Sequence, residues 1–149
     1  MDIVRIFESY CNDNDIAFYY GSNAHLNLIE GSLDVDKIYF LMFPPKRSNV
    51  VNDNKTRIKG TTYNGKFLLV VNGDYAQHYF NENGTNPSDS KFTENVEPLL
   101  QAFNNAGNYI LSGCGLDLDL QLWENDDAIN VLDANKDGLW CTYRIYTDE

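Results

Sequence analysis

The segment that most clearly suggests a chemical function spans residues 133–138, where the sequence DANKDG matches the first half of a calcium-binding loop. Such a loop places oxygen ligands at alternate positions, and its glycine permits the sharp turn. The match then fails, because Arg144 stands where a glutamate must close the coordination shell. The residues that follow alternate like a strand. We therefore expect a hairpin turn here, with calcium binding as the weaker alternative.

Carboxylates gather after the middle of the chain. They would serve acid–base or metal chemistry only if they converged in a pocket. Two of them lie on the polar side of an alternating segment, where carboxylates are solvated, and the others fall in an expected turn at residues 124–127. We expect solvated groups, with an ion pair between subunits as the alternative, for Asp117, Asp119, Glu124, Asp126 and Asp127.

No motif indicates catalysis. His25 and His78 are the only histidines, and neither has the context of a catalytic triad or a zinc site. The glycines around Cys114 follow an expected helix, whereas a dinucleotide-binding loop follows a strand. Cys11, Cys114 and Cys141 are widely spaced, which is typical of small buried side chains and not of a zinc or redox pair. The sequence predicts a protein that is not an enzyme, with no catalytic or metal-binding residues and no cofactor.

Charge is distributed unevenly along the chain. The first 75 residues carry 8 basic and 9 acidic side chains, and the remainder carry 3 and 13. One stretch of 14 residues holds five of the 11 cations: Lys46, Arg47, Lys55, Arg57 and Lys59. A solvated loop leading into an edge strand would explain this stretch, because lysines discourage edge pairing. The alternative is a head-to-tail interface in which this basic segment of one subunit meets the acidic part of the next.

A second candidate interface lies near the end of the chain. In residues 139–146 one face of the expected strand carries Leu139, Cys141, Tyr143 and Ile145, and the other carries Trp140, Thr142, Arg144 and Tyr146. Both faces hold bulky side chains, so a partner could cover the second one. Trp140 and Arg144 therefore join the candidate interface residues, although core placement of Trp123 and Trp140 is an equal alternative.

The elements that would position these residues follow from periodicity. Apolar residues at helical spacing predict one helix from residue 3 to 11 and a long one from 93 to 112, with an irregular start near Pro98. Strands are expected at 16–20, 25–29, 37–43, 55–63, 66–71 and 116–122, then a hairpin of 128–132 with 139–146. Residues 46–54 are expected to be a polar loop and Asn64-Gly65 a hairpin turn. In residues 116–122, leucines should all share one face.

Together these elements predict a single α+β domain over residues 1–149, with a mainly antiparallel sheet packed against an N-terminal helix and one long second helix. The formal net charge of −11 argues against general binding of duplex nucleic acid. Residues 1–10 lack the pattern of a secretory signal, and no apolar run is long enough to span a membrane, so we expect an intracellular protein without membrane contact.

Four segments carry a resemblance to a known family: MDIVRIFESYC, KIYFLMFPPKRSNVV, KFTENVEPLLQAFNNAGNYIL and DANKDGLWCTYRIYTDE. In element order, length and acidity the chain resembles the tail terminator and neck proteins of tailed bacteriophages. The terminal strand that opens with Asp137-Gly138-Leu139 adds to the likeness. The double proline at Pro44-Pro45 departs from it.

The resemblance implies a structural virion subunit that oligomerises into a ring at the head–tail junction or the tail-tube end. The ring would hold roughly six or twelve copies, contact neighbouring tail or connector proteins, and let DNA pass without specific binding. Its location would be the virion, and the host cytoplasm during assembly. The alternatives are a small acidic cytoplasmic binding module and a DNA-mimic inhibitor of a nucleic-acid-binding protein.

Overall fold

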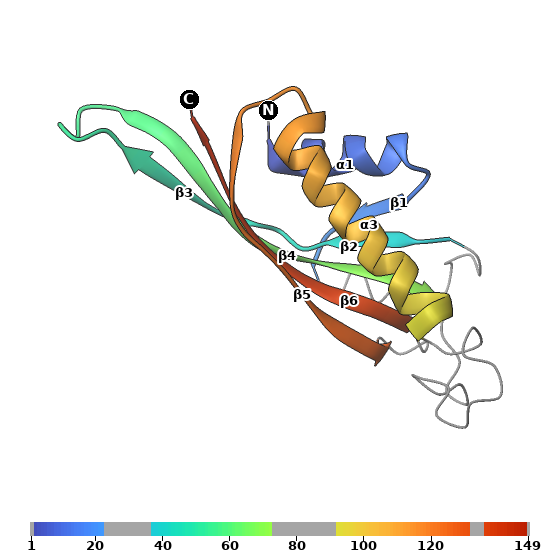
Figure 1. Ribbon diagram of the computed structural model, residues 1–149. Helices are drawn as coiled ribbons and strands as arrows, with labels where there is room; N and C mark the ends of the chain where they lie inside the picture. The colour runs from blue at the N-terminus through green and yellow to red at the C-terminus, as the bar shows by residue number, and fades with distance from the viewer. Residues whose placement is uncertain (1, 23–36, 73–91, 132–135, 149) are drawn as a thin grey trace.

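The computed structural model describes residues 2–22, 37–72, 92–131 and 136–148 (Figure 1). The segment expected at 25–29, together with His25 and His78, lies outside these residues. The described elements form an α+β fold with one mostly antiparallel sheet, as the sequence predicted.

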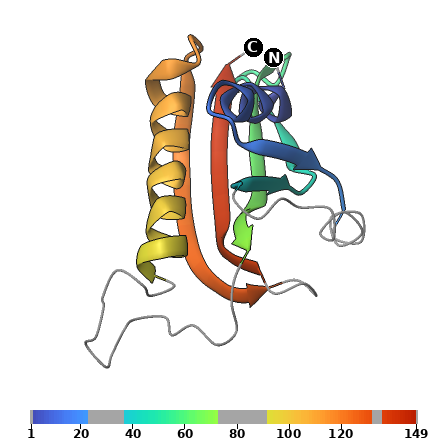
Figure 2. The ribbon, with the colours of Figure 1, turned by 90° about the vertical axis from the view of Figure 1, so that its right-hand side faces the viewer.

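Two helical segments lie on the same side of the sheet (Figures 1 and 2). Helix α1 is Ile3–Asp13, and Asp2 caps it by accepting a hydrogen bond from the Val4 amide at 2.9 Å. The second segment is continuous but irregular: π-helical η3 (Phe92–Val96), α-helical α3 (Glu97–Asn108) and π-helical η4 (Tyr109–Gly113). Both helices and the irregular start before Pro98 were predicted.

Six strands of the sheet lie in the described residues. Five of them follow the order β1-β2-β4-β6-β5, and β3 pairs with β4 on the same side as β2. Among the strand pairs that the structure describes, only β1–β2 is parallel. The strand bounds are β1 Ala17–Tyr20, β2 Tyr39–Met42, β3 Lys46–Val51, β4 Ile58–Asn72, β5 Leu118–Val131 and β6 Lys136–Asp148.

The main core lies between the helices and one face of the sheet. Alternate residues of the long strands point into it, and aromatic rings dominate its centre: Phe40 and Phe67 stack with ring centroids 4.2 Å apart. Trp123 stacks on Phe103 at 4.8 Å and donates a hydrogen bond to the Phe103 carbonyl at 3.2 Å. The core face predicted for residues 139–145 is confirmed, since Leu139, Cys141, Tyr143 and Ile145 are all buried.

The prediction of a polar loop at residues 46–54 is wrong. Lys46–Val51 forms strand β3, which pairs with β4 from Lys46 opposite Asn64 to Val51 opposite Ile58. Backbone pairing with a long neighbouring strand outweighs the polar composition, because exposed edge positions accept polar side chains. The turn therefore falls between Val51 and Ile58.

The hairpin turn predicted at Asn64-Gly65 is also wrong, because β4 runs through it from Ile58 to Asn72. A constraint other than a turn explains the glycine at position 65. A Cβ on Gly65 would lie 2.5 Å from the Tyr143 hydroxyl, so the tyrosine of the neighbouring strand occupies the space of a side chain. Glycine within a strand often marks such a close approach.

Strand β5 corrects two further expectations. Residues 124–127 belong to the strand and are not a turn. A register shift between Leu120 and Leu122 interrupts the alternation, so that Leu122 pairs with Arg144 on the open face while Trp123 enters the core. One extra residue in a bulge reverses every later side chain in this way.

The predicted pairing of the last two strands is confirmed, and both extend further than expected. Residues 133–135 of the calcium-like segment lie outside the described part. Lys136, Asp137 and Gly138 belong to β6. Asp137 is fully buried, and its carboxylate accepts a hydrogen bond from Asn95 Nδ2 at 2.8 Å.

Candidate interaction site

A β-hairpin extends away from the helices at one end of the sheet. We call the hairpin formed by residues 46–62 the arm; Figure 1 shows it reaching beyond α1 and the end of α3. Its turn is tied by Asn52, whose side-chain oxygen accepts from the Thr56 amide at 2.9 Å and whose backbone carbonyl accepts from the Lys55 amide at 2.9 Å. Lys55 adopts a positive φ of 55° in this turn. These bonds fix the shape of the tip that presents Lys55 and Arg57.

The arm carries an apolar pair at its tip. Val51 and Ile58 face each other across the β3–β4 ladder and are 49% and 47% exposed. Lys55, Arg57 and Lys59 around them are exposed as well. A cationic tip with two exposed aliphatic side chains has the mixed character of an interface.

Arg47 has a role within the chain. Its guanidinium donates to both carboxylate oxygens of Asp2, at 2.9 and 3.0 Å, and this pairing raises the pKa of Arg47. The pair links β3 to the start of α1. Arg47 is therefore engaged within the chain.

The opposite edge of the sheet is acidic. Among the described strands, β5 pairs only with β6, so its outer edge is unpaired there. Asp117 and Asp119 are exposed where this strand begins, and a hollow of about 250 Å³ is lined there by Leu116, Asp117, Leu118, Thr147 and Asp148.

The turn from η4 into β5 adds apolar surface to this edge. Leu111 is 58% exposed and Leu116 is 41% exposed. We call the segment from Leu111 to Asp119 the corner. It combines two exposed leucines with two carboxylates, which is the chemical complement of the arm tip.

Register places the arm and the corner at the same level of the sheet. One row across four strands joins Asn49, Thr61, Thr147 and Leu118. Val51 lies two residues beyond this row on β3, and Leu116 lies two residues beyond it on the chain entering β5. Since the strands at the two edges run antiparallel, both residues lie toward the same end of the sheet.

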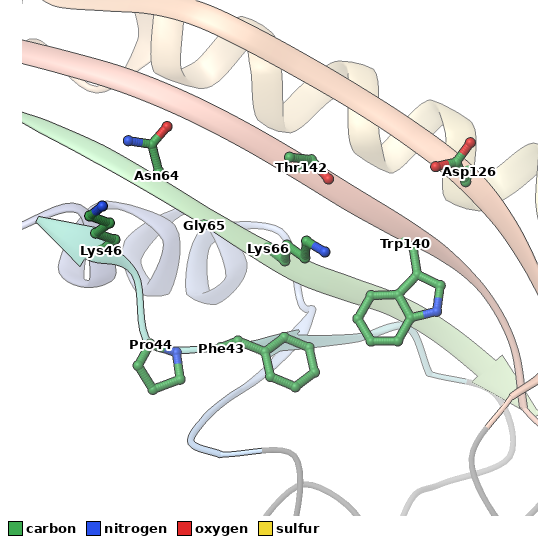
Figure 3. A pocket seen from close by; sticks show the side chains of 9 residues that line it. All are labelled: Phe43, Pro44, Lys46, Asn64, Gly65, Lys66, Asp126, Trp140 and Thr142. Carbon is green, nitrogen blue, oxygen red and sulfur yellow. The ribbon is translucent and has the colours of Figure 1, made fainter.

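The face opposite the helices holds a pocket of about 730 Å³ (Figure 3). Phe43 and Trp140 stack at its base with ring centroids 5.5 Å apart, and Trp140 is 36% exposed. Polar side chains surround the aromatic pair, and the whole lining is Phe43, Pro44, Lys46, Asn64, Gly65, Lys66, Asp126, Trp140 and Thr142.

Arg144 lies on this open face beside the pocket and donates a hydrogen bond to Asn64 Oδ1 at 2.8 Å. The candidate interface residues thus fall into separate places. Lys55, Arg57 and Lys59 belong to the arm tip, Asp117 and Asp119 to the corner, and Lys46, Trp140 and Arg144 to the open face.

The cysteines match the expectation of buried small side chains at two positions. Cys11 and Cys141 are buried, while Cys114 lies half-buried in the corner. Burial raises the pKa of the Cys11 thiol to about 12 and also raises that of Cys141. Within the described residues no group of three histidine, cysteine or acidic side chains is arranged to hold a metal ion.

No protein-family model matches the chain, and comparison with curated proteins finds no significant sequence match. None of the helices in the described segments is long and apolar enough to cross a membrane.

Sequence reasoning identified the charges of this site but not its apolar residues. The sequence predicts a loop at Val51, a strand of unassigned face at Ile58, and the buried side of a strand at Leu116. Val51 and Ile58 are exposed because β3 and β4 extend as a hairpin away from the helices. Leu116 is exposed because it precedes β5, which begins at Leu118. One local pattern does indicate an exposed apolar side chain: Ile58 stands between the cations Arg57 and Lys59.

Proposed function

We propose that this chain is a structural subunit that joins copies of itself head to tail into a ring, as at the head–tail junction or tail-tube end of a bacteriophage. The observation that carries the proposal is the pair of opposite sheet edges. One presents the cationic arm, and the other presents the anionic corner at the same level. Contacts between two different surfaces form closed rings when the rotation between copies closes.

The charge of the molecule suits such a role. With a net charge of −11, a ring of these subunits would repel the phosphate backbone in its channel, so DNA could pass without being held. Neighbouring tail or connector proteins would contact the rims of the ring. The chain is proposed to work without catalysis or a cofactor.

Native mass spectrometry and sedimentation at low and moderate salt test the proposal. We expect a closed multiple of roughly six or twelve copies at low salt, which dissociates as salt screens the contacts between arm and corner. A chain that stays monomeric at every concentration and salt level would contradict self-assembly.

The open-face pocket favours a second candidate, a small binding module. Its volume of about 730 Å³ and its Phe43–Trp140 base are compatible with a planar ligand. A binding module would remain monomeric, and its ligand would raise the melting temperature. Loss of that shift in Trp140→Ala, together with a monomeric mass, would favour this function over the ring. The DNA-mimic alternative predicts instead a salt-sensitive complex with a cationic protein.

A further inference from the structure

We infer that the arm tip binds the corner of the next copy through a specific apolar contact, in which Val51 and Ile58 pack on Leu111 and Leu116. This inference rests on the proposed head-to-tail assembly and names the residues at its centre. The occupant of the corner is therefore a second copy of this chain.

Exposure supports the pairing. Six large hydrophobic side chains of the described residues are exposed, and four of them are these two pairs. One pair lies on the arm, and the other lies in η4 and the turn that leads into β5 at the opposite edge of the sheet, so a single chain cannot bring them together. Two copies placed side by side in the same orientation can, because Val51 and Leu116 lie the same two residues beyond a shared row of the sheet.

Charge surrounds the apolar contact on both sides. Lys55, Arg57 and Lys59 flank the aliphatic pair of the arm, and Asp117 and Asp119 follow Leu116 in the corner. The hollow beside Leu116, lined also by Asp117 and Asp148, has a volume of about 250 Å³ and could receive one cationic side chain. An apolar centre with a charged rim is the usual organisation of a protein interface.

The geometry of the tip also fits a docking element. Asn52 holds the turn through bonds to the Lys55, Thr56 and Arg57 amides, so the tip is already ordered before binding. Less conformational freedom is then lost on association.

Disulfide trapping between two single variants tests the contact. Ile58→Cys and Leu116→Cys are each made in a Cys114→Ser chain, mixed in equal amounts and oxidised mildly. We expect a mixed 58–116 dimer, formed about tenfold faster than in a mixture of Lys66→Cys with Leu116→Cys, because assembly raises the effective concentration of the facing thiols. Lys66 is an exposed cation on the open face and serves as the matched control.

Paired substitutions provide a second readout that needs no crosslink. Val51→Ser with Ile58→Ser should raise the concentration for half-assembly about tenfold or more, because aliphatic surface is no longer buried. Leu111→Ser with Leu116→Ser should do the same. All four changes together should cost less than the sum of the two pairs, since both pairs remove the same contact.

The outcomes separate this contact from the ring itself. Rings that persist without a 58–116 disulfide, and with additive serine effects, would overturn the contact and leave self-assembly standing. Dimers linked 58 to 58 would overturn it in favour of a tip-to-tip arrangement. A chain that never assembles would overturn both proposals.

Discussion

The two edges of the sheet differ in length and in charge. The β3 edge is a strand of 6 residues that begins after a double proline, has one register shift near its end and leads into the tip of the arm. The β5 edge belongs to a strand of 14 residues, interrupted by two register shifts and rich in carboxylates. Bulges and charges are the common means by which proteins keep free edges from pairing.

The difference between the edges bears on which contacts can form. One sign of charge predominates on each edge: cations on the arm, where Asp53 is the one exposed carboxylate, and carboxylates along β5. A second copy of the same edge is therefore repelled. The charges do not act against the opposite edge, where the predominant charge has the other sign. This arrangement disfavours two-fold dimers and favours head-to-tail contacts, which is why we place the assembly interface at the edges and not on the open face.

Substitutions in the middle of the sheet should change the stability of the fold, whereas substitutions at either edge should change assembly. Gly65→Ala places a methyl group where the Tyr143 ring lies, and we expect it to lower the free energy of unfolding by about 2–3 kcal/mol. Chemical denaturation measures the change. The neighbouring exposed substitution Lys66→Ala is the control and should stay within about 0.5 kcal/mol of the unmodified chain. Equal effects would show that Gly65 is not under the packing constraint described here.

Charge reversal on the arm should affect assembly and leave folding unchanged. In the triple variant Lys55→Glu, Arg57→Glu, Lys59→Glu, three exposed attractions become repulsions, so we expect self-association to weaken at least about tenfold. Sedimentation at low salt measures association, and thermal unfolding checks the fold. Lys66→Glu, a cation away from the edges, should change neither. An equal loss of association in that control would mean that net charge, and not the arm, governs assembly.

Removing the cap of α1 should cost stability without affecting the edges. Asp2→Ala deletes both the hydrogen bond to the Val4 amide and the pair with Arg47, and we expect a loss of about 1 kcal/mol. Arg47→Ala keeps the cap and removes the exposed ion pair together with the contact of the guanidinium with the Tyr63 ring, 5.8 Å from its centroid, and it should cost less. If Arg47→Ala instead abolished assembly with the fold intact, Arg47 would belong to the interface after all.

Thiol labelling compares the reactivity of cysteines in the core with that of the cysteine in the corner, and it needs no substitution. Burial raises the pKa of Cys11 to about 12 and raises that of Cys141, so both thiols stay protonated at pH 8 and are also inaccessible. We expect a thiol reagent to modify Cys114 alone in the folded monomer and all three cysteines after unfolding. Assembly should slow the labelling of Cys114 a few-fold, because the corner becomes covered. Labelling that is independent of protein concentration would argue against that cover.

The sequence predicted the helices and the fold class because their signals are local. Apolar residues at helical spacing mark α1 and the long second helix, and the alternation in residues 139–146 identifies the core face of β6. The errors arose where nonlocal pairing decides the structure. Asn64-Gly65 has the composition of a turn, yet the space that it leaves is filled by Tyr143 from a distant part of the chain.

The candidate site divides in the same way. The charges of the two edges were visible in the sequence, because cations cluster at residues 46–59 and carboxylates after residue 116. That these charges lie at one level of the sheet follows only from the register of β3, β4, β6 and β5. The exposure of Val51 and Leu116 could not be inferred either, since it depends on where each strand ends.

One measurement tests the head-to-tail claim most directly. Two variants are prepared, one with the arm reversed (Lys55→Glu, Arg57→Glu, Lys59→Glu) and one with the corner reversed (Asp117→Lys, Asp119→Lys). Each variant alone should fail to assemble, because its arm and corner then carry the same sign. Native mass spectrometry of an equal mixture should show rings restored, with the two variants alternating in equal numbers. Mixtures that stay monomeric while the unmodified chain forms rings would contradict the pairing of arm with corner.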